Sequence, residues 1–537
     1  MRQHFINGRI YTGELPFQEA FSVADGVFLK VGSNEKILSD ASPQDEIIDL
    51  SGRFVCAGFN DSHMHLLNFG QTLNDAPLWK HTGSLSDLID SMKEHLENHP
   101  PKGNAWLCGR GWNQDYFEDA NRMPERRDLD RISTEIPIMI TRACGHCCVV
   151  NTKALELARI DNDTAAPDGG AIGRDGDGPD GRFFDNAMDL IMAARPDPDI
   201  DDIKEMIRSA SSELNRYGIT SVQSDDYCVF RNVDPELINR AYRELERDGS
   251  LSVRVYEQCN FTGLKDLESF VNAGNVSGKG TDLFRIGPLK MLGDGALGSR
   301  TAHLSKPYND SPDNSGFSLF SAETFNEMIS FANSHGMQAA VHTIGDACLD
   351  TVLDAYEKAL AEHPKADHRH GIIHCQITRS DQLERIARLG LHVYAQSVFL
   401  DYDNHIVEKL VDPSIAKTSY NWKTLMDMGV SVSNGSDCPV EHPDVMKGIE
   451  CAVTRRSLDG TGPYLMDQAF SVREAIDSFT LRSAEASFEE RFKGRIAPGY
   501  VADFTVLGED PFRCDASSIH SISVIMTCLG GRCVYKA

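Results

Sequence analysis

Two histidines separated by one residue follow an apolar run near the start of the chain, in FNDSHMHLLNFG. If this run is a β-strand, His63 and His65 lie on the same face, because alternate side chains of a strand point to the same side. Two imidazoles on one face are a good start for a Zn²⁺ site. A single His-x-His pair is weak evidence, because two unrelated histidines would give the same spacing.

The same placement, a polar residue late in an apolar run, recurs further along the chain. Lys290 lies near the end of FRIGPLKML, His342 in MQAAVHT, His374 in HGIIHCQ and Asp437 in VSVSNGSDCP. A buried polar group without a partner is costly, so a hydrogen-bonded core histidine would explain one of these positions but not the whole set. Imidazoles combined with one carboxylate are typical of hydrolytic metal sites. The sequence therefore predicts a metal centre built from the ends of several strands.

These runs belong to a region in which apolar runs alternate with amphipathic stretches such as ETFNEMISFANSHG and SDQLERIARLG. Gly390 ends the second stretch and is a helix-stop signal. Alternating strands and helices predict βαβ units and a parallel sheet. Seven such runs follow residue 200, and RFVCAGFN near residue 56 makes eight. Eight is the number that closes a (β/α)₈ TIM-type barrel, in which active sites lie at the carboxyl ends of the strands.

Both ends of the chain are rich in short strand-like runs. The Asn7-Gly8 and Asp25-Gly26 pairs predict hairpin turns between them. We therefore predict an α/β protein with three parts: a small β-sandwich domain formed by both termini (1–56 and 490–537), a barrel (57–75 and 205–489) and an inserted cap segment (76–204) over the barrel mouth.

The inserted segment holds two features that could suggest a metal. The stretch APDGGAIGRDGDGPDGR lacks the Glu-terminated spacing of a Ca²⁺ loop, so a solvated turn is the better interpretation. Cys144, His146, Cys147 and Cys148 are close in sequence, but no second cysteine pair stands at finger spacing. A structural zinc site is therefore not predicted here.

Composition excludes several classes of protein. The 537 residues include 53 basic and 80 acidic side chains, a formal charge of −27, which opposes binding to nucleic acid or to an anionic membrane. No run approaches the roughly 20 apolar residues of a membrane span. The first residues do not resemble a secretory signal, and the 14 cysteines are scattered, as in a protein with reduced thiols. A cytoplasmic protein is expected.

The order of these residues along the predicted strands resembles the metal-dependent amidohydrolase superfamily. Within it, the chain is similar to the YtcJ-like branch (amidohydrolase family 3), which includes N-substituted formamide deformylases. The motifs that carry this resemblance are GRGWNQ (109–114), GHCCVVNTKAL (145–155), KMLGDGALGSRTA (290–302), VHTIGDA (341–347) and SDCPV (436–440). The ending GRIAPGYVADFTVL also resembles the family, so that the similarity covers essentially the whole chain.

The resemblance implies six metal ligands: His63, His65, Lys290, His342, His374 and Asp437. The first two would share the more buried metal with Asp437, and His342 and His374 would serve a second position. Lys290 matches a lysine that is carbamylated and bridges both ions in binuclear members. The resemblance leaves open whether one or two ions bind, with zinc expected, and whether Lys290 is carboxylated.

This ligand set implies a catalytic scheme. A divalent cation lowers the pKa of bound water toward neutrality. Asp437 would accept the proton of that water and return it to the leaving nitrogen. His374 or His342 would help the metal to polarise the carbonyl. These roles suit hydrolysis of an amide-type C–N bond, although the same groups can open an ester or a lactone.

The family motifs also suggest substrate contacts. Trp112 and His146 match motif positions on the inserted segment that resemble part of a wall over the metal, although Trp112 could equally pack in a core. Asp294, Arg300 and Thr301 follow Lys290 closely. Asp294 could instead belong to a turn, and Arg300 to an ion pair.

We therefore expect a metal-dependent amidohydrolase that acts on a small amide, formamide or cyclic amide. One alternative is another hydrolytic class, a lactonase or a heterocycle deaminase. A second is a non-catalytic scaffold of the same fold, which typically loses metal ligands, whereas this chain keeps all of them. The expected partner is a small-molecule substrate, and a homodimer is an option because many barrel enzymes of this kind are dimers.

Overall fold

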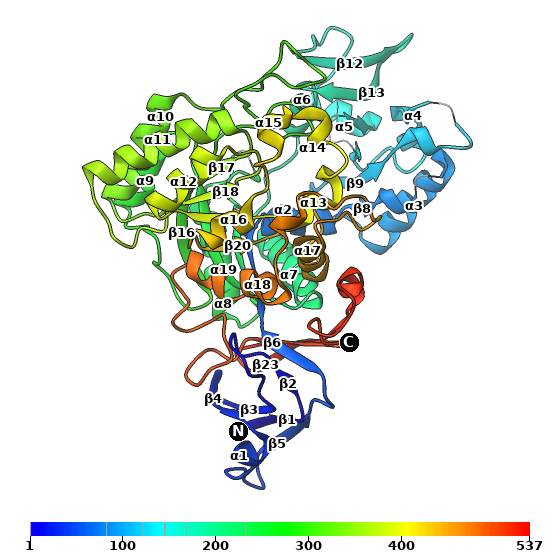
Figure 1. Ribbon diagram of the computed structural model, residues 1–537. Helices are drawn as coiled ribbons and strands as arrows, with labels where there is room; N and C mark the ends of the chain where they lie inside the picture. Colours follow the sequence, from blue (N-terminus) through cyan, green and yellow to red (C-terminus); the bar gives the residue numbers. More distant parts are fainter. Residues whose placement is uncertain are drawn as a thin grey trace. The chain divides into compact units, whose positions relative to one another are not determined.

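The computed structural model describes residues 2–81, 83–101, 103–120, 122–143, 147–167, 169–230 and 232–537 (Figure 1). The chain divides into two compact units. The first consists of Met1–Asn68 and Ile207–Ala537, and the second is Phe69–Met206. Within the described residues, no helix has both the length and the apolar character needed to cross a membrane.

The first unit contains a sheet of eight parallel strands in the order β20-β19-β18-β17-β16-β15-β14-β7. Its strands are β7 (Phe59–Met64), β14 (Ile219–Ser224), β15 (Arg254–Asn260), β16 (Phe284–Leu292), β17 (Ala339–Thr343), β18 (Gly371–His374), β19 (His392–Ala395) and β20 (Val432–Asn434). Beyond β20, Asp437 N donates to His63 O, and His65 N donates to Cys438 O, which joins the last strand to the first. The predicted eight-stranded barrel is confirmed as a nearly closed sheet.

Helices connect the barrel strands, as the sequence pattern predicts, and three more, α17 to α19, follow the last strand. The main ones are α7 (Ile200–Arg216), α8 (Pro235–Arg247), α9 (Leu264–Asn272), α10 (Ala322–Ser334), α11 (Asp346–Glu362), α12 (Ser380–Leu389), α16 (Trp422–Asp427), α17 (Val445–Thr454), α18 (Val472–Ser478) and α19 (Leu481–Ala486). Ser321 caps α10 by accepting a hydrogen bond from Thr324 N. Gly390 ends α12 in the left-handed conformation, with φ 65°.

Two smaller sheets are built from the chain termini, as expected for a β-sandwich. One has the order β4-β3-β1-β5, and the other β2-β6-β21-β22-β23. The strands are β1 (Gln3–Ile6), β2 (Arg9–Ile10), β3 (Ala20–Ala24), β4 (Val27–Gly32), β5 (Glu46–Asp49), β6 (Phe54–Ala57), β21 (Phe504–Leu507), β22 (Val524–Leu529) and β23 (Arg532–Lys536). Phe5, Phe21, Phe28 and Phe504 pack together in the buried core between them, and the N and C marks lie close to these strands in Figure 1.

One predicted hairpin is wrong. Asp25-Gly26 joins β3 to β4 in an antiparallel pair, as expected. Asn7-Gly8 does not form a hairpin, because β1 pairs with β3 and β5, while β2 pairs with β6 in the other sheet. Both edges of β1 are therefore occupied, and the turn with Asn7 at φ 56° carries the chain from one sheet to the other.

The second unit has its own sheet, with the order β12-β13-β11-β10-β9-β8. Its strands are β8 (Ala76–Pro77), β9 (Leu107–Trp112), β10 (Ile138–Arg142), β11 (Cys147–Val150), β12 (Gly170–Asp175) and β13 (Gly178–Asp185), and its helices are α3 (Leu85–Asn98), α4 (Arg126–Asp130), α5 (Thr152–Ala158) and α6 (Met188–Met192). Ser84 caps α3 by accepting a hydrogen bond from Asp87 N. The Gly/Asp-rich stretch is not a simple turn, because most of it forms the antiparallel pair β12–β13. A role of this unit as a cap remains a prediction.

Candidate metal centre

The six predicted ligands all lie at the carboxyl ends of barrel strands. His63 lies within β7, Lys290 near the end of β16 and His342 within β17, and His374 is the last residue of β18. His65 and Asp437 follow the ends of β7 and β20. Because neighbouring strands are parallel and in register, with Leu292 opposite His342 and Thr343 opposite His374, these side chains meet at one end of the barrel.

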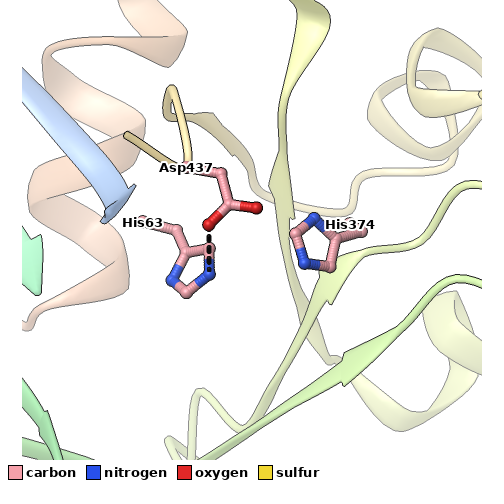
Figure 2. Close-up of side chains that lie close together, drawn as sticks. All are labelled: His63, His374 and Asp437. Carbon is pink, nitrogen blue, oxygen red and sulfur yellow. Dashed lines mark ion pairs between the residues drawn. The ribbon is translucent and has the colours of Figure 1, made fainter. Parts of the chain in front are cut away.

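Three of the six form a compact group. One ligand atom from each of His63, His374 and Asp437 lies within 4.8 Å of the others, and all three residues are buried. Their side chains face one another from three different segments (Figure 2). Nε2 of His63 is 3.4 Å from Oδ1 of Asp437.

His65 extends this group through Asp437. Its Nε2 lies 3.1 Å from Oδ1 of Asp437, and its Nδ1 lies 2.9 Å from the main-chain oxygen of Asp225. Burial disfavours the charged ring, but the hydrogen bond to Asp437 and the charges of Asp225 and Asp437 outweigh it and raise the pKa of His65 to about 9. Without an ion, a proton on His65 therefore neutralises the carboxylate.

Two glutamine side chains determine which ring nitrogen of His63 and of His374 carries the hydrogen. Nδ1 of His63 lies 2.7 Å from Oε1 of Gln258, and Nδ1 of His374 lies 2.7 Å from Oε1 of Gln396. An amide oxygen can only accept, so each Nδ1 must carry the hydrogen and each Nε2 keeps its lone pair. Burial lowers the pKa of both rings, and the charge of nearby Lys290 lowers the pKa of each further, so both rings are neutral.

The groups that converge here fit a divalent cation. The Nε2 atoms of His63 and His374 and the carboxylate of Asp437 offer electron pairs within one small region, and His65 Nε2 lies beside them at Asp437 Oδ1. Neutral imidazoles and a carboxylate are ligands that zinc and related ions prefer. Buried lone pairs such as those on Nε2 of His63 and His374 are unfavourable without a partner, and a bound cation would supply one.

Lys290 lies outside the group of three. Its Nζ is 3.4 Å from Oδ2 of Asp225, and both side chains are buried. Within the described part of the chain, this Nζ makes no hydrogen bond. Asp225 also accepts a hydrogen bond of 3.0 Å from Nδ2 of Asn260. Carboxylation of Lys290 remains a prediction.

His342 is close to the group but turned toward a neighbouring loop. Its ring centroid is 4.4 Å from that of His374. Its Nε2 lies 3.2 Å from the main-chain oxygen of Gly295 and 3.5 Å from Oδ1 of Asp294. Because a carbonyl oxygen only accepts, Nε2 carries the hydrogen, and only Nδ1 of His342 is left to bind an ion. Burial, with a contribution from Lys290, lowers the pKa of His342 to about 3.

The backbone at the site has an uncommon conformation. His374, Cys375 and Asp437 have φ values of 73°, 50° and 57°, in the left-handed region that non-glycine residues rarely adopt. Hydrogen bonds hold these positions: Trp422 Nε1 donates to His374 O at 3.0 Å, and Asp437 N donates to His63 O at 2.8 Å. Backbone strain of this kind clusters at functional sites.

Asp294, a predicted substrate contact, is engaged by the backbone. Its carboxylate accepts hydrogen bonds from the N–H groups of His303, Ile344 and Gly345, at 2.8 to 3.0 Å. Burial raises the pKa of Asp294 to about 7, although these bonds oppose the rise. The side chain ties the loop after β16 to the loop after β17.

Arg300 and Thr301 also have local partners. Arg300 Nη2 donates to Asp310 Oδ2 at 2.6 Å, and this ion pair is exposed. Thr301 Oγ1 accepts a hydrogen bond from Ala296 N at 3.1 Å and lies 2.7 Å from Ser299 Oγ. Substrate contact by either residue remains a prediction.

Of the two predicted substrate contacts on the inserted segment, the structure describes only Trp112. Trp112 is fully buried in a hydrophobic cluster of the second unit, and its Nε1 makes no hydrogen bond with the described residues. His146 lies outside the described residues, as does Cys144. Cys147 and Cys148 are buried in separate hydrophobic clusters, so these two thiols do not share a site.

Sequence reasoning missed three residues of the site: Asp225, Gln258 and Gln396. Gln258 lies near the end of β15, and the other two directly follow β14 and β19. The rule that found the ligands, a polar residue late in an apolar run, would also have found these residues. Gln258 and Gln396 carry neutral amides, which are not typical metal ligands, whereas Asp225 is a carboxylate directly after β14 and fits the same rule as Asp437.

Known proteins are similar to this chain over most of its length. The Amidohydrolase family matches residues 46–535. The amidohydrolase-family protein YtcJ of Bacillus subtilis (strain 168) is 35% identical over 543 residues, which cover 100% of both chains. The N-substituted formamide deformylase of Arthrobacter pascens is 26% identical, over 96% of this chain and 95% of its own.

Solved structures agree with this relationship. An uncharacterized metal-dependent hydrolase from Pyrococcus horikoshii OT3 is 30% identical, with a TM-score of 0.79, over 96% of this chain and 99% of its own. The family match spans most of the sequence, and these relatives are similar over nearly their full length. With its barrel and the metal-binding groups at the strand ends, the chain therefore belongs to the amidohydrolase family.

Proposed function

We propose that this protein is a metal-dependent hydrolase that cleaves a C–N bond of a small amide, formamide or cyclic amide. The observation that carries the proposal is the buried group of His63, His374 and Asp437, whose ligand atoms lie within 4.8 Å of one another. Membership of the amidohydrolase family and the name of the formamide deformylase relative support this class of bond. Zinc is the proposed ion, because imidazole nitrogens and one carboxylate suit it.

The residues of the site have separate roles in this proposal. His63, His65, His374 and Asp437 would hold the ion, with His342 and Lys290 beside them. A bound divalent cation supplies a more acidic water and a polarised substrate carbonyl. Asp437 accepts, at a carboxylate oxygen, the proton that water loses as it adds to the carbonyl carbon. It then returns this proton to the leaving nitrogen, so that an amide and water become a carboxylic acid and an amine.

The proposal is tested by metal analysis and substrate profiling. Protein grown with bicarbonate and purified without chelators is analysed by elemental mass spectrometry, and then assayed on matched panels of amides, formamides, lactones and amino-heterocycles. We expect bound metal and turnover of amides or formamides. Turnover of lactones or amino-heterocycles alone would replace the C–N assignment. Protein that takes up no metal after addition of Zn²⁺ would favour a non-catalytic scaffold.

A further inference from the structure

Two buried glutamines contact the metal-binding histidines from neighbouring strands. Gln258 and Gln396 are 0% exposed, and each places Oε1 at 2.7 Å from the Nδ1 of a ring, His63 and His374 respectively. We propose that Gln258 and Gln396 are positioning residues that set the tautomer and orientation of these rings for metal binding. This inference rests on the proposed function, because it concerns the ion at that site.

The chemistry of the amide makes the orientation specific. With Oε1 facing the ring, Nδ1 donates a hydrogen and Nε2 keeps the lone pair that an ion needs. With the amide reversed, the NH₂ group would face Nδ1, the hydrogen would move to Nε2, and the ring would lose its metal-binding atom. A hydrogen bond to the distal nitrogen also makes an imidazole a stronger ligand.

The two glutamines differ at their other end. Nε2 of Gln258 donates to the main-chain oxygen of Ser62 at 3.1 Å, so both ends of this amide are held. Nε2 of Gln396 makes no hydrogen bond with the described residues, although it is buried. The orientation of Gln258 is therefore fixed by the protein, whereas the orientation of Gln396 depends on its bond to His374.

This difference predicts that replacing each glutamine by glutamate affects zinc binding differently. In Gln396→Glu, the unpaired NH₂ becomes an oxygen, the bond to Nδ1 is kept, and a carboxylate supports His374 more strongly than an amide does. In Gln258→Glu, the new oxygen faces the carbonyl oxygen of Ser62, and two acceptors repel one another. We expect zinc binding to be kept or strengthened by Gln396→Glu and weakened by Gln258→Glu.

The experiment measures the Zn²⁺ dissociation constant of each full-length protein by competition with a chromogenic chelator. The variants are Gln258→Leu, Gln396→Leu and the two glutamate variants. The matched control is Gln223→Leu: Gln223 is a buried glutamine of β14 that donates to Ser483 O at 2.8 Å, and its Oε1 makes no hydrogen bond with the described residues. Co²⁺ absorption spectra and the apo-protein melting temperature are recorded in parallel.

We expect Gln258→Leu and Gln396→Leu each to weaken zinc binding by about 10- to 100-fold and to change the Co²⁺ spectrum. Gln223→Leu should lower the melting temperature while leaving zinc affinity within about threefold of the wild type. If a leucine variant fails to fold, the opposite responses of the two glutamate variants decide the question.

The possible outcomes distinguish failure of the proposed function from failure of the inference about the two glutamines. Wild-type protein that binds no divalent ion overturns the proposed function and this inference together. Wild-type protein that binds zinc while both leucine variants bind it equally tightly overturns the inference alone, as does an identical response of the two glutamate variants.

Discussion

Oδ1 of Asp437 lies 3.1 Å from Nε2 of His65, a residue 372 positions earlier in the chain. The contact connects the segment after the last barrel strand to the segment after the first. The same oxygen lies 3.4 Å from Nε2 of His63, so one carboxylate serves two imidazoles. Both contacts are made by Oδ1, so the proposed mechanism assigns the exchange of a proton with water or substrate to Oδ2 of Asp437.

Asp437→Asn tests the role of this carboxylate. The amide can still place an oxygen near the histidines, but it is too weakly basic to accept a proton. We expect turnover of the best substrate to fall by about 10²- to 10⁴-fold at full metal occupancy. The measurement is kcat together with metal content for each preparation. Asp427→Asn, in an exposed aspartate at the end of α16, is the matched control. Near-wild-type turnover of Asp437→Asn with full metal would refute the assignment.

Asp294 and Arg300 offer a contrast between structural and substrate roles. Asp294→Asn replaces one acceptor oxygen with a donor that faces a backbone N–H, so the free energy of unfolding should fall by about 1–3 kcal/mol. Arg300→Ala removes an exposed ion pair and should cost no more than about 1 kcal/mol. Urea unfolding measures both changes. Unchanged stability with a raised KM in Asp294→Asn would instead support substrate contact.

Gly58 precedes the barrel strand that carries His63 and packs against β14. A Cβ at this position would lie 2.2 Å from Oγ1 of Thr220. We expect Gly58→Ala to lower the free energy of unfolding by about 1–3 kcal/mol through overpacking. The double variant Gly58→Ala/Thr220→Ala should recover part of this loss, as measured by thermal unfolding. Equal stability of the single and double variants would show that the strain lies elsewhere.

His392, at the start of β19, predicts a dependence of stability on pH. Burial lowers the pKa of this ring to about 3, and its Nε2 lies 2.8 Å from Ser433 Oγ. The unfolded chain binds a proton near pH 6.5, whereas the folded chain does not until about pH 3. Stability is therefore complete above pH 6.5 and falls as the pH decreases toward 3. Each such histidine contributes a slope of about 1.4 kcal/mol per pH unit.

His392→Gln should remove that share of the slope. The measurement is urea unfolding of the metal-free protein at several pH values from neutral to mildly acidic. His370 has a similarly lowered pKa of about 3 from burial and remains as an internal reference in this variant. A slope identical to that of the wild type would show that His392 does not stay neutral in the folded protein.

Much of the barrel could be predicted from the sequence, because buried parallel strands appear as apolar runs. The predicted ligands stand near the carboxyl ends of these runs. The passage of the chain from one sheet to the other at Asn7-Gly8 could not be predicted, because it depends on which strand edges are already paired. The orientation of His342 toward Gly295 was also hidden, because it is set by the loop after β16. Gln258 and Gln396 were within reach but carry no charge to mark them.

The hydrogen bonds from Asp437 N to His63 O and from His65 N to Cys438 O have a consequence for biosynthesis. They join the first barrel strand to the residues after the last, and β6, just before the first barrel strand, pairs with β21, which follows the barrel. During translation, the proposed set of metal ligands is therefore incomplete until Asp437, the last of them in the sequence, has been synthesised. If this group binds an ion as proposed, we expect chains truncated before Asp437 to bind it more weakly, because they lack the carboxylate that contacts both His63 and His65.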